Sequence, residues 1–265
     1  GYQTKALANR SIALGSFANA SENASIAIGV SANASGVQSL AIGPYASASH
    51  QKATAIGHQA EASGFSSAAI GVDSIANKGN AQAIGHSAIA SAINATAIGT
   101  SAEASGKYSS SFGTEANATG EDAIAVGFLA TASDIDSIAI GTSALANKAN
   151  ALAIASNAKA DGANAIAIGV FSKALTANAQ AFGVKAYADG VNAVAIAAGS
   201  NATGTNSMAF GVESIANNTN TVAVGTKAVA SGIGALSFGA KAQATALDTM
   251  AFGVNALASE GNATA

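Results

Sequence analysis

One fourteen-residue unit is repeated along the chain without insertion or deletion. It reads SIAIGVSANASGVQ at residues 25–38, SLAIGPYASASHQK from Ser39 and TMAFGVNALASEGN from Thr249. Counted from Ser11, there are eighteen complete copies. A period this strict indicates a repeat architecture, in which each copy forms the same structural unit and packs against its neighbours.

The positions of the unit differ sharply in how much they vary. We number them one to fourteen, starting at Ser25. Position four is apolar and position ten is Ala in every copy, while positions one, three and eight are always small. Position five is Gly except at Ala155 and Ala197. Positions eleven to fourteen carry turn-forming residues, with Asn favoured at position fourteen, where we expect the side chains to hydrogen-bond their own turn and to stack as a ladder.

A coiled coil is the first alternative for a period of two heptads. It is excluded because a Gly in nearly every copy would cost about 1 kcal/mol each inside a helix, and no seam of large apolar residues recurs. Small and large residues instead alternate with period two on both sides of the Gly, which predicts two short strands per unit. We therefore predict an all-β parallel solenoid, with one coil per unit and coils about 4.8 Å apart.

A coil of fourteen residues leaves little space between its two strands. We expect the small residues of positions one, three, five, eight and ten to fill this interior, and the Gly of position five to adopt a positive φ at a bend. Positions two and four then point outward and form an apolar stripe larger than a monomer normally exposes. We therefore predict an obligate oligomer with position four between protomers; the alternative places position four inside each protomer. The predicted interface residues are Ile28, Ile56, Ile84, Phe112, Ile140, Ile168, Phe182, Phe210, Phe238 and Phe252.

Composition and charge exclude several classes of function. The 265 residues carry a net charge of -3, only 9% are charged, and none is Cys. The absence of Cys excludes disulfides and thiolate metal sites. No basic cluster is present to hold nucleic acid or an anionic membrane, and no run of about 18 apolar residues predicts a membrane-spanning helix.

Residue types that perform catalysis or bind metals do not cluster. His58 and His86 share position six but lie two coils apart, about 10 Å by the coil spacing, which is too far to share a metal ion within one chain. Glu61 and Glu103 share position nine three coils apart, so they do not form a pair of catalytic carboxylates. We expect no enzymatic activity, no metal and no cofactor.

Position nine is free to vary and points outward from the second predicted strand. It carries apolar residues on neighbouring coils, which can contact a partner. The alternative is that β-branched residues occur there because they favour strands. Apolar residues at position thirteen, such as Phe65 and Ile135, are candidates for covering an edge of the oligomer. The candidate contact surface at position nine consists of Ile75, Ile89, Leu145, Tyr187, Ile215 and Val229.

The tandem run SxAIGxxAxASGxx resembles the YadA-like head of trimeric autotransporter adhesins of Gram-negative bacteria. That repeat centres on Asn-Ser-Val-Ala-Ile-Gly, followed by a spaced Ser or Ala. The nearest copies here are NSMAFG at residues 206–211 with Ser214, and DSIAIG at residues 136–141 with Ala144. The resemblance covers the whole chain. It implies a left-handed parallel β-roll, a side-by-side homotrimer, and one head domain over residues 1–265 with about 19 repeats.

The resemblance also implies a location and a function. We expect placement on the bacterial cell surface, with the stalk and the outer-membrane anchor outside these residues. The head is then a non-enzymatic adhesin that contacts extracellular-matrix proteins such as collagen and fibronectin, host cells, other bacteria or abiotic surfaces through many weak contacts, in virulence or biofilm formation. The position-nine residues become the candidate adhesive surface. Because Phe at position four is heavier than the family's usual Ile or Val, we expect different packing in the C-terminal half.

Other functions and solenoids remain as alternatives. The runner-up function is a structural spacer or shield that holds a separate binding domain away from the cell. Hexapeptide solenoids run in multiples of six, and calcium-binding nonapeptide repeats need a GGxGxD motif that is missing here. Ice binding is a third hypothesis, which is disfavoured because the residues of positions eight and ten are small, mostly Ala, and are expected to face inward.

Overall fold

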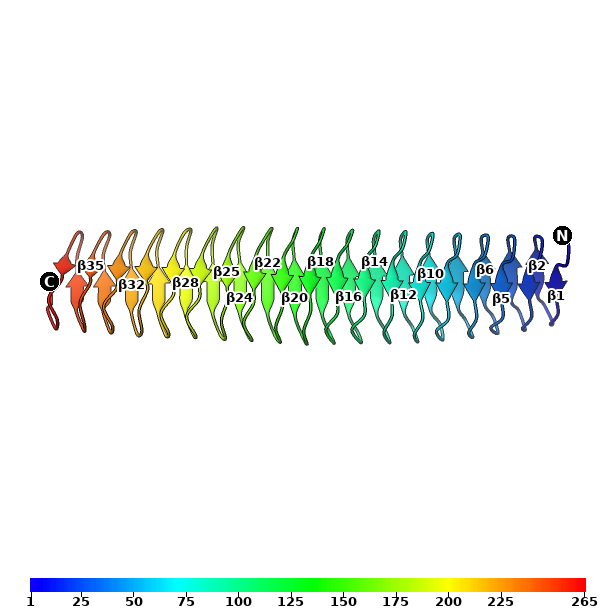
Figure 1. Cartoon of the computed structure of the whole chain (residues 1–265), viewed down its shortest axis with the longest axis horizontal. Coiled ribbons are helices and arrows are strands. Elements are labelled where there is room, and N and C mark those ends of the chain that lie inside the picture. The colour runs from blue at the N-terminus through cyan, green and yellow to red at the C-terminus, as the bar shows by residue number, and fades with distance from the viewer. The chain divides into compact units, whose positions relative to one another are not determined.

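The computed structural model describes residues 1–265 and consists of strands and turns. The chain forms two compact units, Gly1–Ser133 and Asp134–Ala265, and each is described by itself. In both units each repeat forms one coil with a three-residue strand and a two-residue strand (Figure 1). The predicted all-β solenoid with fourteen-residue coils is confirmed. No helix long and apolar enough to cross a membrane is present.

The first unit, Gly1–Ser133, stacks its strands into two parallel sheets. Each strand pairs in register with the equivalent strand fourteen residues further on, as Ile26 does with Leu40. The long-strand sheet contains β2 (Ile12–Leu14), β4 (Ile26–Ile28), β6 (Leu40–Ile42), β8 (Thr54–Ile56), β10 (Ala68–Ile70), β12 (Gln82–Ile84), β14 (Thr96–Ile98), β16 (Ser110–Phe112) and β18 (Ile124–Val126). The short-strand sheet contains β1 (Lys5–Ala6), β3 (Asn19–Ala20), β5 (Asn33–Ala34), β7 (Ser47–Ala48), β9 (Glu61–Ala62), β11 (Ile75–Ala76), β13 (Ile89–Ala90), β15 (Glu103–Ala104), β17 (Asn117–Ala118) and β19 (Thr131–Ala132).

The second unit, Asp134–Ala265, repeats this arrangement with the same register, as in the pairing of Lys173 with Tyr187. Its long-strand sheet contains β20 (Ile138–Ile140), β22 (Leu152–Ile154), β24 (Ile166–Ile168), β26 (Gln180–Phe182), β28 (Val194–Ile196), β30 (Met208–Phe210), β32 (Val222–Val224), β34 (Leu236–Phe238) and β36 (Met250–Phe252). Its short-strand sheet contains β21 (Leu145–Ala146), β23 (Lys159–Ala160), β25 (Lys173–Ala174), β27 (Tyr187–Ala188), β29 (Asn201–Ala202), β31 (Ile215–Ala216), β33 (Val229–Ala230), β35 (Gln243–Ala244) and β37 (Leu257–Ala258).

Two turns close each coil, and both contain a residue with left-handed backbone. At the first turn the Ala32 N–H donates to the Gly29 carbonyl at 3.3 Å, and φ of Ser31 at position seven is 57°. The second turn has the same form seven positions later, with φ of 59° at Gln38. Asn and Gly accept this conformation most readily. Position fourteen shows that preference in the sequence, whereas position seven does not.

The core of each unit consists of small side chains between the two sheets. Ala27 of position three and Ala34 of position ten are fully buried, as are their equivalents in most coils. Position one is also buried, and its hydroxyl can cap the turn, as Ser25 Oγ does by donating to the Glu22 carbonyl at 2.6 Å. Thr221 is among the largest fully buried side chains. The interior therefore admits only small residues, as predicted.

Position five does not belong to this interior, and our prediction was wrong on that point. The positive φ is confirmed, with 137° at Gly29. However, Gly29 lies at the outer corner of the coil and is only half-buried. Gly is strongly favoured there because the backbones of successive coils approach each other closely, and because few L side chains tolerate this φ.

Asparagines at position fourteen form a hydrogen-bonded ladder in the second unit. Asn164 Nδ2 donates to Asn178 Oδ1 at 3.1 Å, and Asn178 Nδ2 donates to Asn192 Oδ1 at 2.9 Å. The series extends without a break from Asn150 to Asn220. The predicted stacking of these side chains along one exposed edge is confirmed.

Candidate binding surfaces

The residues of positions two and four lie on the outer face of the long-strand sheet. In β4 and β24 the central Ala is buried, whereas the two flanking residues are only half-buried. Position four is therefore outside the protomer core, and its burial between protomers stays a prediction. The predicted interface residues on this face are Ile28, Ile56, Ile84 and Phe112 in the first unit, and Ile140, Ile168, Phe182, Phe210, Phe238 and Phe252 in the second.

Aromatic rings at position four stack on one another near the end of the second unit. The centroids of Phe238 and Phe252 are 5.1 Å apart, and their planes differ by 3°. The Phe252 side chain is nevertheless 51% exposed. Parallel stacking between coils satisfies one face of each ring and leaves apolar area on the outside of the sheet. Ring stacking of this kind is not open to the Ile residues that occupy position four elsewhere.

Position nine lies on the outer face of the short-strand sheet. Ile75 pairs with Ile89 in the first unit, and Ile215 pairs with Val229 in the second. These side chains are half-buried. Leu145 stands alone and is followed on the ladder by a lysine. The apolar residues at position nine thus form short pairs between polar residues, and not a continuous stripe.

Polar side chains of positions nine and eleven interact across this same face of the second unit. Asn147 Nδ2 donates to Asp161 Oδ1 at 2.7 Å, and Lys159 Nζ lies 3.1 Å from Asp161 Oδ2. The hydrogen bond from Asn147, followed by the interactions with Lys159, lowers the pKa of Asp161 below its usual 3.8. Tyr187 donates its hydroxyl to Asp189 Oδ2 at 3.0 Å, and burial, followed by this bond, raises the pKa of Tyr187.

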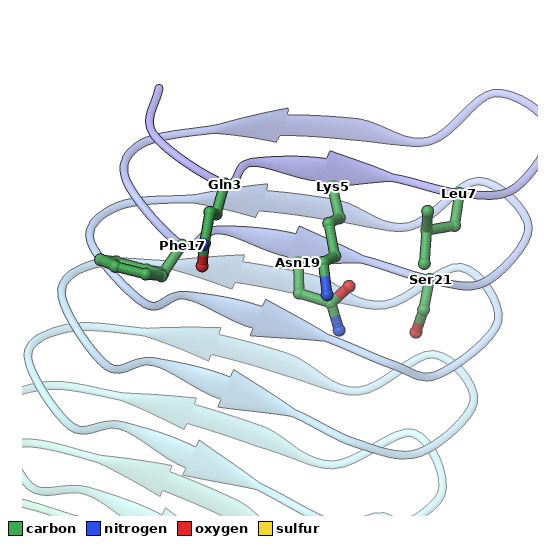
Figure 2. Close-up of a pocket in the computed structure, with 6 residues that line it drawn as sticks. All are labelled: Gln3, Lys5, Leu7, Phe17, Asn19 and Ser21. Carbon is green, nitrogen blue, oxygen red and sulfur yellow. The ribbon is translucent and has the colours of Figure 1, made fainter.

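A groove lies over position nine at the start of the first unit. It encloses about 390 Å³ and is open to solvent. Figure 2 shows side chains from two successive coils in three neighbouring pairs, with Lys5 and Asn19 in the middle. The lining residues are Gln3 and Phe17 of position seven, Lys5 and Asn19 of position nine, and Leu7 and Ser21 of position eleven.

The second unit has a groove built from the same positions. It encloses about 440 Å³ and is lined by Phe171 and Lys185 of position seven and by Lys173 and Tyr187 of position nine. Of these residues, only Tyr187 was predicted from the sequence as a contact residue. Lys173 could have been found from the repeat of fourteen, which places it beside Tyr187 on the short-strand ladder, whereas Phe171 and Lys185 lie in a turn and gave no such signal.

The residues of position thirteen and the histidines lie at the turns. Phe65 is 42% exposed and Ile135 is 47% exposed. His50 packs edge-on against Phe65 with ring centroids 6.1 Å apart, and His58 packs in the same way against Tyr45 at 6.0 Å. No three His, Cys, Asp or Glu side chains lie close enough together to hold a metal ion.

Stacked coils with a core of small residues and freely varying outer positions define a repeat protein of the β-solenoid class. The sequence model of the YadA head domain repeat matches residues 1–74, 76–102, 104–196, 202–228 and 230–265. The chain therefore belongs to the YadA head family, the adhesin-type domain of trimeric autotransporters, and the resemblance seen in the sequence is confirmed. None of the curated proteins compared with the chain matches it.

Proposed function

We propose that this chain is the head of a trimeric autotransporter adhesin and attaches a bacterium to surfaces without enzymatic activity. The observation that carries this proposal is the difference between the constant core positions and the variable outward-facing positions of each coil. Core positions such as those of Ala27 and Ala34 hardly change along the chain, whereas the outward-facing positions two and nine vary from coil to coil. Such variation on a constant scaffold provides many distinct surface contacts.

The proposal includes a homotrimer of side-by-side, left-handed β-rolls, with residues 1–265 as one head domain. It is supported by the row of large apolar residues at position four, which the protomer leaves only partly covered. An exposed apolar stripe of this extent is typical of an interface between subunits. Burying it against two further copies removes this apolar area from water and aligns three equivalent outer faces.

Adhesion then results from many weak contacts made at the same time. Each half-buried pair such as Ile75 and Ile89 offers a small contact area, which by itself gives weak binding. Repetition along the head and threefold symmetry make further contacts intramolecular, so that overall avidity exceeds the affinity of any one contact. The proposed partners are extracellular-matrix proteins, host cells, other bacteria or solid surfaces. The proposed location is the cell surface, with anchoring in the outer membrane through parts outside this chain.

A solid-phase assay with the purified head tests this function. The head is offered to immobilised collagen, immobilised fibronectin, cultured cells and bare plastic, and bound protein is measured after washing. We expect saturable binding to at least one of these surfaces. Binding to none of them would contradict the adhesive function and leave the alternative of a structural spacer or shield.

A further inference from the structure

The groove of the second unit combines lysine ammonium groups that make no ion pair with aromatic rings that make no stacking contact. Lys173 and Lys185 make no ion pair; the lysines that do are Lys107, Lys159 and Lys227. The rings of Phe171 and Tyr187 make no aromatic stacking contact, and neither lies under a lysine ammonium. Phe171 is 49% exposed.

The register of the coils places these four residues in an alternating square. Phe171 and Lys173 lie two residues apart on one coil, and Lys185 and Tyr187 lie two residues apart on the next. Lys173 and Tyr187 are direct partners on the short-strand ladder, and all four side chains line one hollow of about 440 Å³. Each ammonium therefore neighbours aromatic rings along and across the ladder, and a ligand lying in the groove meets both.

Acceptors for hydroxyl groups flank this square. Asp161 is held by Asn147 and Lys159, and Asp189 accepts from Tyr187. Each carboxylate keeps acceptor capacity beyond these bonds. A ligand that carried only negative charge would be repelled by both carboxylates. The surroundings therefore favour a ligand with anionic groups for the lysines, hydroxyl donors for the aspartates and apolar ring faces for the aromatic residues.

Further lysines of the second unit occur on the same outer positions. Lys159 precedes Lys173 on the short-strand ladder, and Lys227 and Lys241 occupy position seven three and four coils beyond Lys185. With coils about 4.8 Å apart, the step from Lys185 to Lys227 is about 14 Å. Lys159 and Lys227 are ion-paired with Asp161 and Glu213, whereas Lys241 is not. Lysines spaced along the solenoid in this way suit a linear polymer better than an isolated small molecule.

We infer that the groove formed by Phe171, Lys173, Lys185 and Tyr187 is a binding site for a linear sulfated polysaccharide. Sulfate groups accept from the lysine ammonium groups, sugar hydroxyls donate to Asp161 and Asp189, and the apolar faces of the sugar rings pack against Phe171 and Tyr187. This inference names a ligand class for the proposed adhesive function and rests on it. The groove is open to solvent, so a polysaccharide longer than the groove can bind in it.

The repeat itself supplies substitutions that the fold accepts. Glu occupies position nine at Glu103 and position seven at Glu115, so Lys173→Glu and Lys185→Glu place residues already found at those positions. Similarly, Ser occupies position seven at Ser143, which supports Phe171→Ser, and Asn occupies position nine at Asn201, which supports Tyr187→Asn. The matched control for charge is Lys52→Asp with Lys78→Glu, since both lysines lie in the turn of the first unit, at positions fourteen and twelve, where Asp122 and Glu22 also occur.

Surface plasmon resonance of the full chain over immobilised heparin tests the inference, with dextran and duplex DNA as competitors. We expect heparin binding that weakens with added salt. The K173E/K185E variant should bind about tenfold more weakly, which corresponds to about 1.4 kcal/mol, and K52D/K78E should bind as the wild type does. The F171S/Y187N variant should bind more weakly than the wild type at the same net charge. Neither competitor should displace heparin.

Three results would overturn the inference. They are absence of heparin binding, equal weakening in the two double-lysine variants, and displacement of heparin by DNA at equal charge concentration. The solid-phase assay on collagen, fibronectin, cells and plastic is run on the same preparations. A head that binds one of those surfaces but not heparin retains the adhesive function and loses the polysaccharide site. A head that binds nothing loses both.

Discussion

Gly29 and Gly43 stack backbone to backbone at the same corner of successive coils, so that a Cβ atom on Gly29 would lie 2.5 Å from the carbonyl oxygen of Gly43. The same corner holds φ at 137° in Gly29. Both constraints concern the Cβ atom. Its absence in Gly permits the positive φ and also the close contact between the two backbones. The preference for Gly at position five therefore comes from the stacking of coils and not from the core.

Substituting Gly29 with Val should destabilise the head. A β-branched side chain is strained at this φ and also collides with the next coil, for an expected loss of about 2–4 kcal/mol in the free energy of unfolding. Denaturant unfolding followed by circular dichroism measures it. Val30→Thr is the control, because Thr occupies the same position at Thr100. Equal stability of G29V and the wild type would refute the stacking argument.

Replacing an Ala at position five with Gly should stabilise the head. Ala155 occupies position five with φ of 107°, a conformation that favours Gly. Ala155→Gly removes this strain, offset in part by the greater freedom of Gly in the unfolded chain, for an expected net gain of about 1 kcal/mol. The same denaturant titration measures the gain. A loss of stability would show that Ala155 contributes a contact worth more than its strain.

The asparagine ladder should contribute modestly to stability. Asn178→Gly keeps the left-handed backbone but removes the two amide hydrogen bonds to Asn164 and Asn192, for an expected loss of about 0.5–1 kcal/mol. Asn255→Gly is the control, because Asn255 has φ of 57°, close to the 58° of Asn178, but lies at position seven, outside the ladder. If both variants unfold at the same denaturant concentration, the ladder has no energetic role.

The Asp161 carboxylate should make stability depend on pH in the acid range. Its pKa in the folded state is lowered from 3.8, chiefly by the hydrogen bond from Asn147. The charged form therefore stabilises the fold at pH values above 3.8, and this contribution is lost as the pH falls through the lower, folded pKa. Thermal unfolding should show that wild type loses more stability on acidification than Asp161→Asn does. Parallel pH profiles would contradict the assigned shift.

Much of the coil structure could be predicted from the sequence, because the strands, the core and the turn each constrain the residue type at different positions of the repeat. Alternation around Gly29 predicts the two strands, the small residues at Ala27 and Ala34 predict a narrow core, and Asn178 predicts a left-handed turn with stacked amides. The interior role assigned to position five was wrong, because a small residue satisfies either a core or a close backbone contact, and composition alone does not distinguish them.

The groove of the second unit could not be predicted in the same way. Position seven accepts Phe171, Lys185 and Ser143 alike, so its left-handed backbone leaves no pattern in the sequence. The neighbourhood of Phe171 and Tyr187 depends on which residue of one coil lies beside which residue of the next. Tyr187 was predicted as a contact residue because it is apolar and occupies an outward-facing position. Lys173 and Lys185 were not predicted, because the chain has few charged residues and they form no cluster in the sequence.

A charge on the position-four stripe should disrupt assembly without unfolding the coil. Ile140 is 38% exposed in the protomer, so Ile140→Glu places its carboxylate in water in the monomer but in an apolar interface in the trimer. We expect a shift toward monomer with strand content preserved by circular dichroism. Glu103→Ala, on the short-strand face, should leave assembly unchanged. Equal assembly of I140E and wild type would place the interface elsewhere.

Sedimentation equilibrium of the unmodified head tests the central claim most directly, since the proposed adhesin requires three chains joined through the position-four stripe. The chain has a mass of 25.2 kDa. We predict a single species with three times this mass that persists on dilution into the micromolar range. A stable, folded species with the mass of one chain would contradict the trimer and the interface assigned to Ile140 and its equivalents.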